Sequence, residues 1–146
     1  MFEKVRAQQP KRGSVKECVL FSLEDSPILM VKQATQANEA YFNAALKMNR
    51  ARVRELQSGN VNVEMIKTTR DRDRILYAKY VVEGWKRVKT DDGKDAPFTK
   101  ENVLEYLKAL PDHIFDNEVR VFCTNHQNFM DEDAPVLEGD DEPGNL

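Results

Sequence analysis

The feature that most constrains the fold is a long segment with a helical period that ends at a clear stop. Four apolar residues between positions 35 and 56 recur close to the helical spacing: Phe42, Leu46, Val53 and Leu56. The Ser-Gly-Asn sequence at 58–60 follows, and glycine just after the last periodic residue is a common helix stop. The segment therefore predicts a long amphipathic helix. Its outer face carries four cations: Lys47, Arg50, Arg52 and Arg54.

Three further helices are expected downstream. The first runs over 63–83, with charges of alternating sign at 70–74 that predict a solvated, weakly paired face. Its expected core face is Ile75, Ala78, Val82 and Trp85, and Gly84 marks its end. Thr99 is a natural N-cap for the next helix, which Pro111 closes. Asp112 is expected to cap the last helix, whose apolar face is Phe115, Val119 and Phe122.

The N-terminal part predicts a short β-hairpin. Residues 17–23 and 28–31 are apolar runs with strand character, and a Glu-Asp-Ser-Pro turn separates them. Two strands alone are marginally stable, so they must pack on helices or on another chain. The expected fold is therefore mostly α (α+β): a small helical domain of about four helices with an N-terminal hairpin.

Charge divides the 146-residue chain into three parts. Residues 1–16 form an expected flexible basic arm, and 17–130 a single globular domain. Residues 131–146 hold seven acids and no base, together with proline and glycine, which predicts a disordered acidic tail. This tail either solvates the protein or shields a basic surface.

The sequence offers no recognisable set of catalytic or metal-binding residues. Cys18 and Cys123 lie in apolar segments and are expected to be buried thiols. Cys123 and His126 have a C-x-x-H spacing, but a structural zinc site needs a second such pair. The acidic turn at 91–95 lacks the register of a calcium loop, and the six glycines form no phosphate loop. We expect a non-enzymatic protein without cofactor or metal.

Composition also bears on partners and compartment. A pI of about 5.5 disfavours a dedicated nucleic-acid domain, although the basic helix face keeps that alternative open. No run of 18 apolar residues is present, and the N-terminus is too polar for a secretory signal. The expected location is the cytoplasm.

An ordered series of short motifs between Arg72 and Phe129 is more specific. It comprises Val-Val-Glu-Gly-Trp at 81–85, Asp-Gly at 92–93, Ala-Pro-Phe-Thr-Lys-Glu-Asn at 96–102, Leu-Pro at 110–111 and Gln-Asn-Phe at 127–129. This series resembles small proteins of the tail modules of tailed bacteriophages, often described as tail assembly chaperones. The resemblance implies a non-enzymatic protein that holds tape-measure or tail-tube protein in the host cytoplasm during virion morphogenesis.

Two groups of residues are the candidate partner-binding sites. One is the basic helix face, which would border a groove for a partner helix. The other is the hairpin, whose edge would accept an added strand through Val19, Phe21, Ile28 and Met30. The alternatives are a virion component, such as a tail-completion or neck protein assembled into a ring, and a less favoured nucleic-acid-associated regulator.

Overall fold

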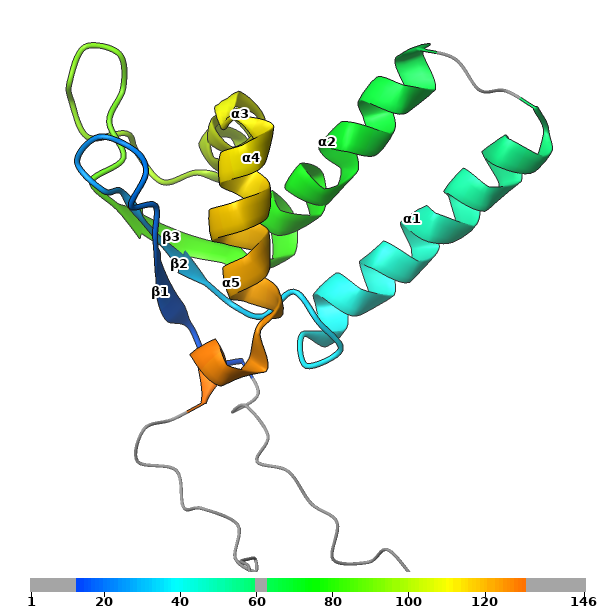
Figure 1. Ribbon diagram of the computed structural model, residues 1–146, viewed down its shortest axis with the longest axis horizontal. Helices are drawn as coiled ribbons and strands as arrows, with labels where there is room; N and C mark the ends of the chain where they lie inside the picture. Colours follow the sequence, from blue (N-terminus) through cyan, green and yellow to red (C-terminus); the bar gives the residue numbers. More distant parts are fainter. Residues whose placement is uncertain (1–12, 60–62, 131–146) are drawn as a thin grey trace, which may run out of the picture.

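The computed structural model describes residues 13–59 and 63–130, arranged as a three-stranded sheet backed by helices (Figure 1). The strands are β1 (Lys16–Val19), β2 (Ile28–Val31) and β3 (Val82–Lys86). The helices are α1 (Glu39–Gln57), α2 (Val63–Tyr80), α3 (Lys100–Ala109), α4 (Asp112–Ile114), the π-helix η1 (Phe115–Arg120), α5 (Val121–Thr124) and the 3-10 helix η2 (His126–Phe129). Because α4, η1 and α5 follow one another without a break, they form one helical segment. Together with α1, α2, α3 and the N-terminal hairpin, this segment confirms the expected small α+β fold of about four helices.

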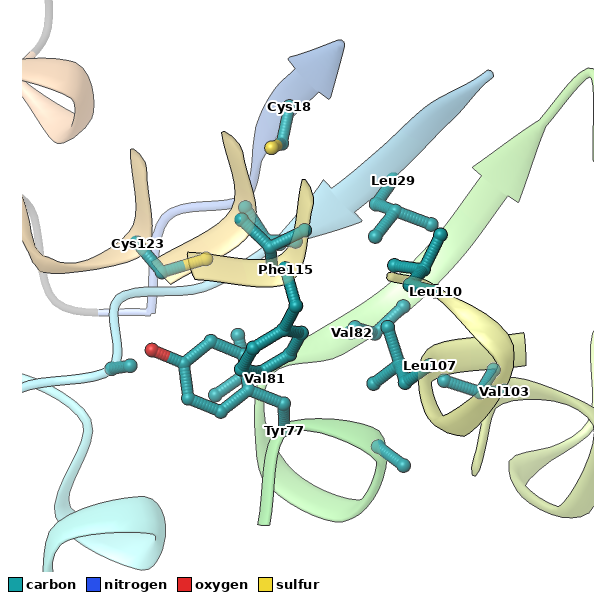
Figure 2. Packing of buried hydrophobic residues seen from close by; sticks show 14 of the residues in the cluster. Cys18, Leu29, Tyr77, Val81, Val82, Val103, Leu107, Leu110, Phe115 and Cys123 are labelled. Carbon is teal, nitrogen blue, oxygen red and sulfur yellow. The ribbon is translucent and has the colours of Figure 1, made fainter. Parts of the chain in front are cut away.

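The sheet has the order β1-β2-β3 with antiparallel neighbours. Cys18 lies opposite Leu29, which in turn lies opposite Trp85, so these three side chains share the face that points to the helices. Figure 2 shows that face meeting the helical layer around Phe115 and Leu107, both of which are fully buried. The hairpin thus obtains from the helices the apolar cover that two strands require.

The third strand corrects the sequence prediction. The expected helix over 63–83 ends at Tyr80, and Val82 and Trp85 belong to β3 rather than to a helix face. The carbonyl of Val81 accepts a hydrogen bond from the Lys32 amide at 2.9 Å, which turns the chain onto the edge of β2. Gly84 is a strand residue against which the Met30 side chain packs, and not a helix stop.

The helix ends follow the sequence in part. Thr99 caps α3 as predicted, since its Oγ1 accepts the amide of Asn102 at 3.0 Å. The expected cap at Asp112 is wrong: it is the first residue of α4, and Pro111 precedes it without a side-chain cap. The helix predicted from residue 35 begins at Glu39, because Asn38 is its N-cap.

The predicted solvated face of α2 contains a buried arginine. Arg74 is 4% exposed. Its Nε donates to the carbonyl of Leu107 at 2.9 Å, and Nη1 donates to that of Arg70 at 3.1 Å. Nη2 donates to the carboxylate of Asp112 at 2.7 Å, and the guanidinium lies 4.5 Å from the centroid of the Phe115 ring. One side chain therefore joins α2 to the ends of α3 and α4.

Two expectations fall mainly outside the described residues: the basic arm over 1–16, of which 13–16 are described, and the acidic tail over 131–146. Within the described ranges, no helix is both long and apolar enough to cross a bilayer.

Arg74 provides a direct test of this packing. Arg74→Met keeps much of the side-chain volume but leaves the buried carbonyl of Leu107 without its donor. We expect the free energy of unfolding to fall by about 2–4 kcal/mol, within the range for disrupting buried polar groups. Urea denaturation followed by circular dichroism measures it. Arg70→Met, at a side chain that is 57% exposed, should change stability by less than about 0.5 kcal/mol; equal losses for the two variants would contradict the assignment.

Candidate interaction surface

Helix α1 is attached to the body of the protein mainly at its N-terminal end. The Nδ2 atom of Asn38 donates to the carbonyls of Gln33 and Tyr80 at 3.0 and 2.9 Å. One turn further on, the Tyr41 ring packs edge-on against Tyr77 with 5.9 Å between centroids. Beyond these contacts α1 runs away from the sheet beside α2, as an antiparallel helical hairpin (Figure 1). None of the 19 residues of α1 is buried.

An apolar row lies along this helix; Phe42 is half-buried, and the other three residues are exposed. Phe42, Leu46 and Val53 fall within about 40° of one another on a helix that turns 100° per residue, and Leu56 lies about 60° beyond Val53. Leu46 is 39% exposed, Val53 50% and Leu56 46%. Side chains of this kind usually contribute to a core, so the row is a surface for another apolar group.

A basic row lies directly beside the apolar row. Lys47, Arg50 and Arg54 fall within an arc of about 60° that begins about 40° from Leu46, whereas Arg52 points to another side of the helix. All four cations are exposed. None of the ion pairs among the described residues includes Lys47, Arg50, Arg52 or Arg54. Together, the two rows are called the α1 face below: Phe42, Leu46, Val53, Leu56, Lys47, Arg50 and Arg54.

The hairpin residues form a smaller and less uniform surface. Val19, at the end of β1, is 40% exposed, and Phe21, in the turn that follows, is 72% exposed. Ile28 is only 8% exposed, so its predicted role in partner binding is not supported. Met30 is half-buried, since it packs over Gly84. Two of the four hairpin residues are therefore well exposed.

The structure does not bring the two groups together. In Figure 1 the β1–β2 turn lies on the opposite side of the molecule from α1, and the remaining helices separate them. The sequence predicts the cations of α1 and its amphipathic period, but not the exposure of its apolar residues. The signal it lacked was the outward course of α1, which depends on contacts with distant residues.

The cysteines and histidines are placed as structural groups. Both thiols are buried and free, and the Cys18 thiol donates to the carbonyl of Glu118 at 3.2 Å. His126 is exposed, with its Nδ1 2.9 Å from Nε2 of Gln33. Over 13–59 and 63–130, no three His, Cys, Asp or Glu side chains gather as metal ligands would.

Burial sets the acid–base properties of these thiols. It raises the pKa of Cys18 to about 12, and the nearby Glu118 carboxylate adds to the rise. The pKa of Cys123 is also raised, first by burial and then by the proximity of Cys18. Both groups therefore stay protonated near neutral pH, and neither is poised as a nucleophile.

Comparison with known proteins gives the chain a family. A sequence model described as YdaY prophage protein matches residues 36–139, which is well over half of the chain. The chain belongs to the YdaY prophage protein family. Membership confirms the phage origin that the motif series implied, while the family's description names no tail role. No curated protein and no solved structure matches the chain.

The extent of the match separates the two candidate surfaces. It begins at residue 36, just before α1, and runs through all later helices to residue 139. The α1 face thus belongs to the part that the YdaY family shares, whereas Val19 and Phe21 lie outside it. We therefore take the α1 face as the principal candidate site.

The burial of Cys18 and Cys123 predicts that both thiols react slowly with reagents in solution. Native protein at pH 8 should react with Ellman's reagent far more slowly than unfolded protein, in which both thiols become accessible. The raised pKa also sets the sign of a pH effect: the thiols' contribution to stability is complete below about pH 8.5, the unfolded pKa, and is lost as the pH rises toward 12. Ser58→Cys, at an exposed turn, is the reactive control; equally fast labelling of the native thiols would contradict the burial.

Proposed function

We propose that this prophage protein is a non-enzymatic assembly chaperone or adaptor of phage tail morphogenesis. In this proposal the α1 face holds an amphipathic segment of the tape-measure or tail-tube protein before assembly. The observation that carries the proposal is the 19-residue helix without a buried residue, which presents an apolar row and a basic row side by side.

The physical properties of the α1 face support a protein partner. Its apolar row suits an amphipathic partner helix whose apolar side chains recur at helical spacing. Covering the exposed parts of Leu46, Val53 and Leu56 contributes about 1 kcal/mol each, because each is already about half covered. The basic row adds selectivity for a partner with acidic residues beside its apolar ones, and it accelerates encounter.

The phage setting supports the nature of that partner. The motif series over 72–129 resembles tail-module proteins, and the family match is to a prophage protein. The resemblance implies that proteins of this kind hold tape-measure or tail-tube protein before assembly, which requires binding and not catalysis. The α1 face has the chemistry for such binding.

A matched pair of substitutions tests the surface. Val53→Glu places a charge in the apolar row, whereas Val121→Glu makes the same change at a similarly exposed valine of α5. The protein and its tape-measure or tail-tube partner from the same prophage would be co-expressed and co-purified, and the dissociation constant measured. We expect Val53→Glu to weaken binding by about ten- to a hundredfold, that is 1.4–2.8 kcal/mol, and Val121→Glu to leave it unchanged.

Other outcomes would identify another function. If neither partner binds and the tape-measure protein is soluble alone, the chaperone proposal is wrong. Detection of the protein in purified virions by mass spectrometry would favour the alternative of a tail-completion or neck component. Binding to DNA that weakens steeply with salt would favour the nucleic-acid-associated alternative. Phe21→Ser separates the hairpin from the α1 face, since only a strand-addition mode should respond to it.

A further inference from the structure

The cations of α1 differ from three arginines elsewhere in the described residues, Arg74, Arg87 and Arg120, which all have polar partners. Arg74 and Arg120 pair with carboxylates, and Arg87 donates to two backbone carbonyls. Arg50 and Arg54, by contrast, take part in none of the ion pairs within 13–59 and 63–130. An exposed basic row beside an exposed apolar row therefore needs a ligand that supplies both acids and apolar groups.

The chain itself contains a segment of this composition. Residues 131–146 carry seven acids and no base, and Val136 and Leu137 stand between two groups of those acids. The arrangement mirrors the α1 face, in which an apolar row is bordered by cations. The family match covers α1 and also runs nine residues beyond Met130, so it includes Val136, Leu137 and Glu138.

The described contacts bring the start of this segment close to α1. The amide of Ala34 donates to the carbonyl of Cys123 at 2.9 Å, and Gln33 contacts His126. The C-terminal end of the fold is thereby held against the residues that lead into α1. Arg50 lies about 18 Å along the helix from Asn38 at 1.5 Å per residue. The sixteen residues 131–146 span up to about 53 Å when extended, which is almost three times that distance.

We propose that the C-terminal segment 131–146 binds the α1 face of its own chain, with Val136 and Leu137 on the apolar row and the flanking acids beside Lys47, Arg50 and Arg54. Attachment to the same chain favours this occupant over a second copy, because a short tether gives an effective concentration of the order of millimolar. The contact itself is independent of any partner. Its role rests on the proposed function: the segment covers the α1 face until a partner displaces it.

A spin label placed in the segment tests the contact without a partner. The variant Gly139→Cys of the full chain provides a labelling site, because the native thiols are buried. The nitroxide should reduce the amide signals of residues 47–54 in heteronuclear NMR spectra and leave those of α3 unaffected. The loss should disappear at about 1 M salt, where the Debye length is only ~3 Å. Uniform signals at low salt would overturn the proposal.

Charge reversal makes the test specific for the basic row. Arg50→Glu together with Arg54→Glu should abolish the signal loss, and adding Glu138→Lys and Asp140→Lys should restore it. The matched control, Arg52→Glu with Lys108→Glu, alters the net charge equally but leaves the row intact, so the loss should persist. A loss that survives reversal of the row would contradict the proposed contact.

Two further measurements show whether the segment comes from the same chain or a second copy, and whether the contact affects partner binding. In a mixture of spin-labelled unenriched protein with ¹⁵N-labelled unmodified protein, signal loss would mean that a second copy supplies the segment, which overturns the in-chain contact. Neutralising the segment with Asp140→Asn, Asp141→Asn and Glu142→Gln should tighten partner binding, by about tenfold if the segment covers the face nine-tenths of the time. Partner binding without an NMR effect would remove this inference alone, whereas an NMR effect without a phage partner would remove the proposed function alone.

Discussion

The structure depends most on the guanidinium of Arg74. Burying a cation is unfavourable unless its donors are satisfied, and here two carbonyls, a carboxylate and an aromatic ring receive it. Two of these groups, Leu107 and Asp112, lie on either side of the Pro111 break, so their positions relative to α2 are fixed by one side chain. Arg74 therefore sets how α2, α3 and α4 pack together in the helical layer that covers the sheet.

This anchorage explains how α1 can project without contributing to the core. The C-terminal part of α2 contributes Tyr77 and Ala78 to the core, and Val81, just after the helix, is also buried there. Asn38 then ties α1 to the end of α2 through the carbonyl of Tyr80. The rest of α1 owes its direction to α2 and not to burial. An amphipathic helix held in this way retains its apolar row for another molecule.

Local patterns predicted the local features of the fold, and long-range contacts account for the errors. The helical periods, the Thr99 cap and the hairpin turn each depend on neighbouring residues, and all are present. Trp85 was assigned to a helix because its spacing from Ile75 fits a helical period, whereas pairing with Leu29 places it in a strand. Two partners of Arg74, Leu107 and Asp112, lie more than thirty residues away, so no pattern within α2 signals its burial. The candidate cations were found from local charge alone, but their unpaired state required the structure.

The cations of α1 also bear on how the proposed binding surface can be kept from associating with itself. An exposed apolar row invites self-association, and a basic row beside it attracts acidic molecules indiscriminately. In the proposed contact, a weak ligand from the same chain would satisfy both rows and yet yield to a partner with better apolar complementarity. Exposed ion pairs are individually weak, so in this proposal selectivity comes from the fit of Leu46 and Val53 to the partner. The acids of residues 131–146 would set how readily the α1 face is uncovered. In the proposed function, the two rows therefore have different roles: apolar contact selects the partner, and charge controls access to the α1 face.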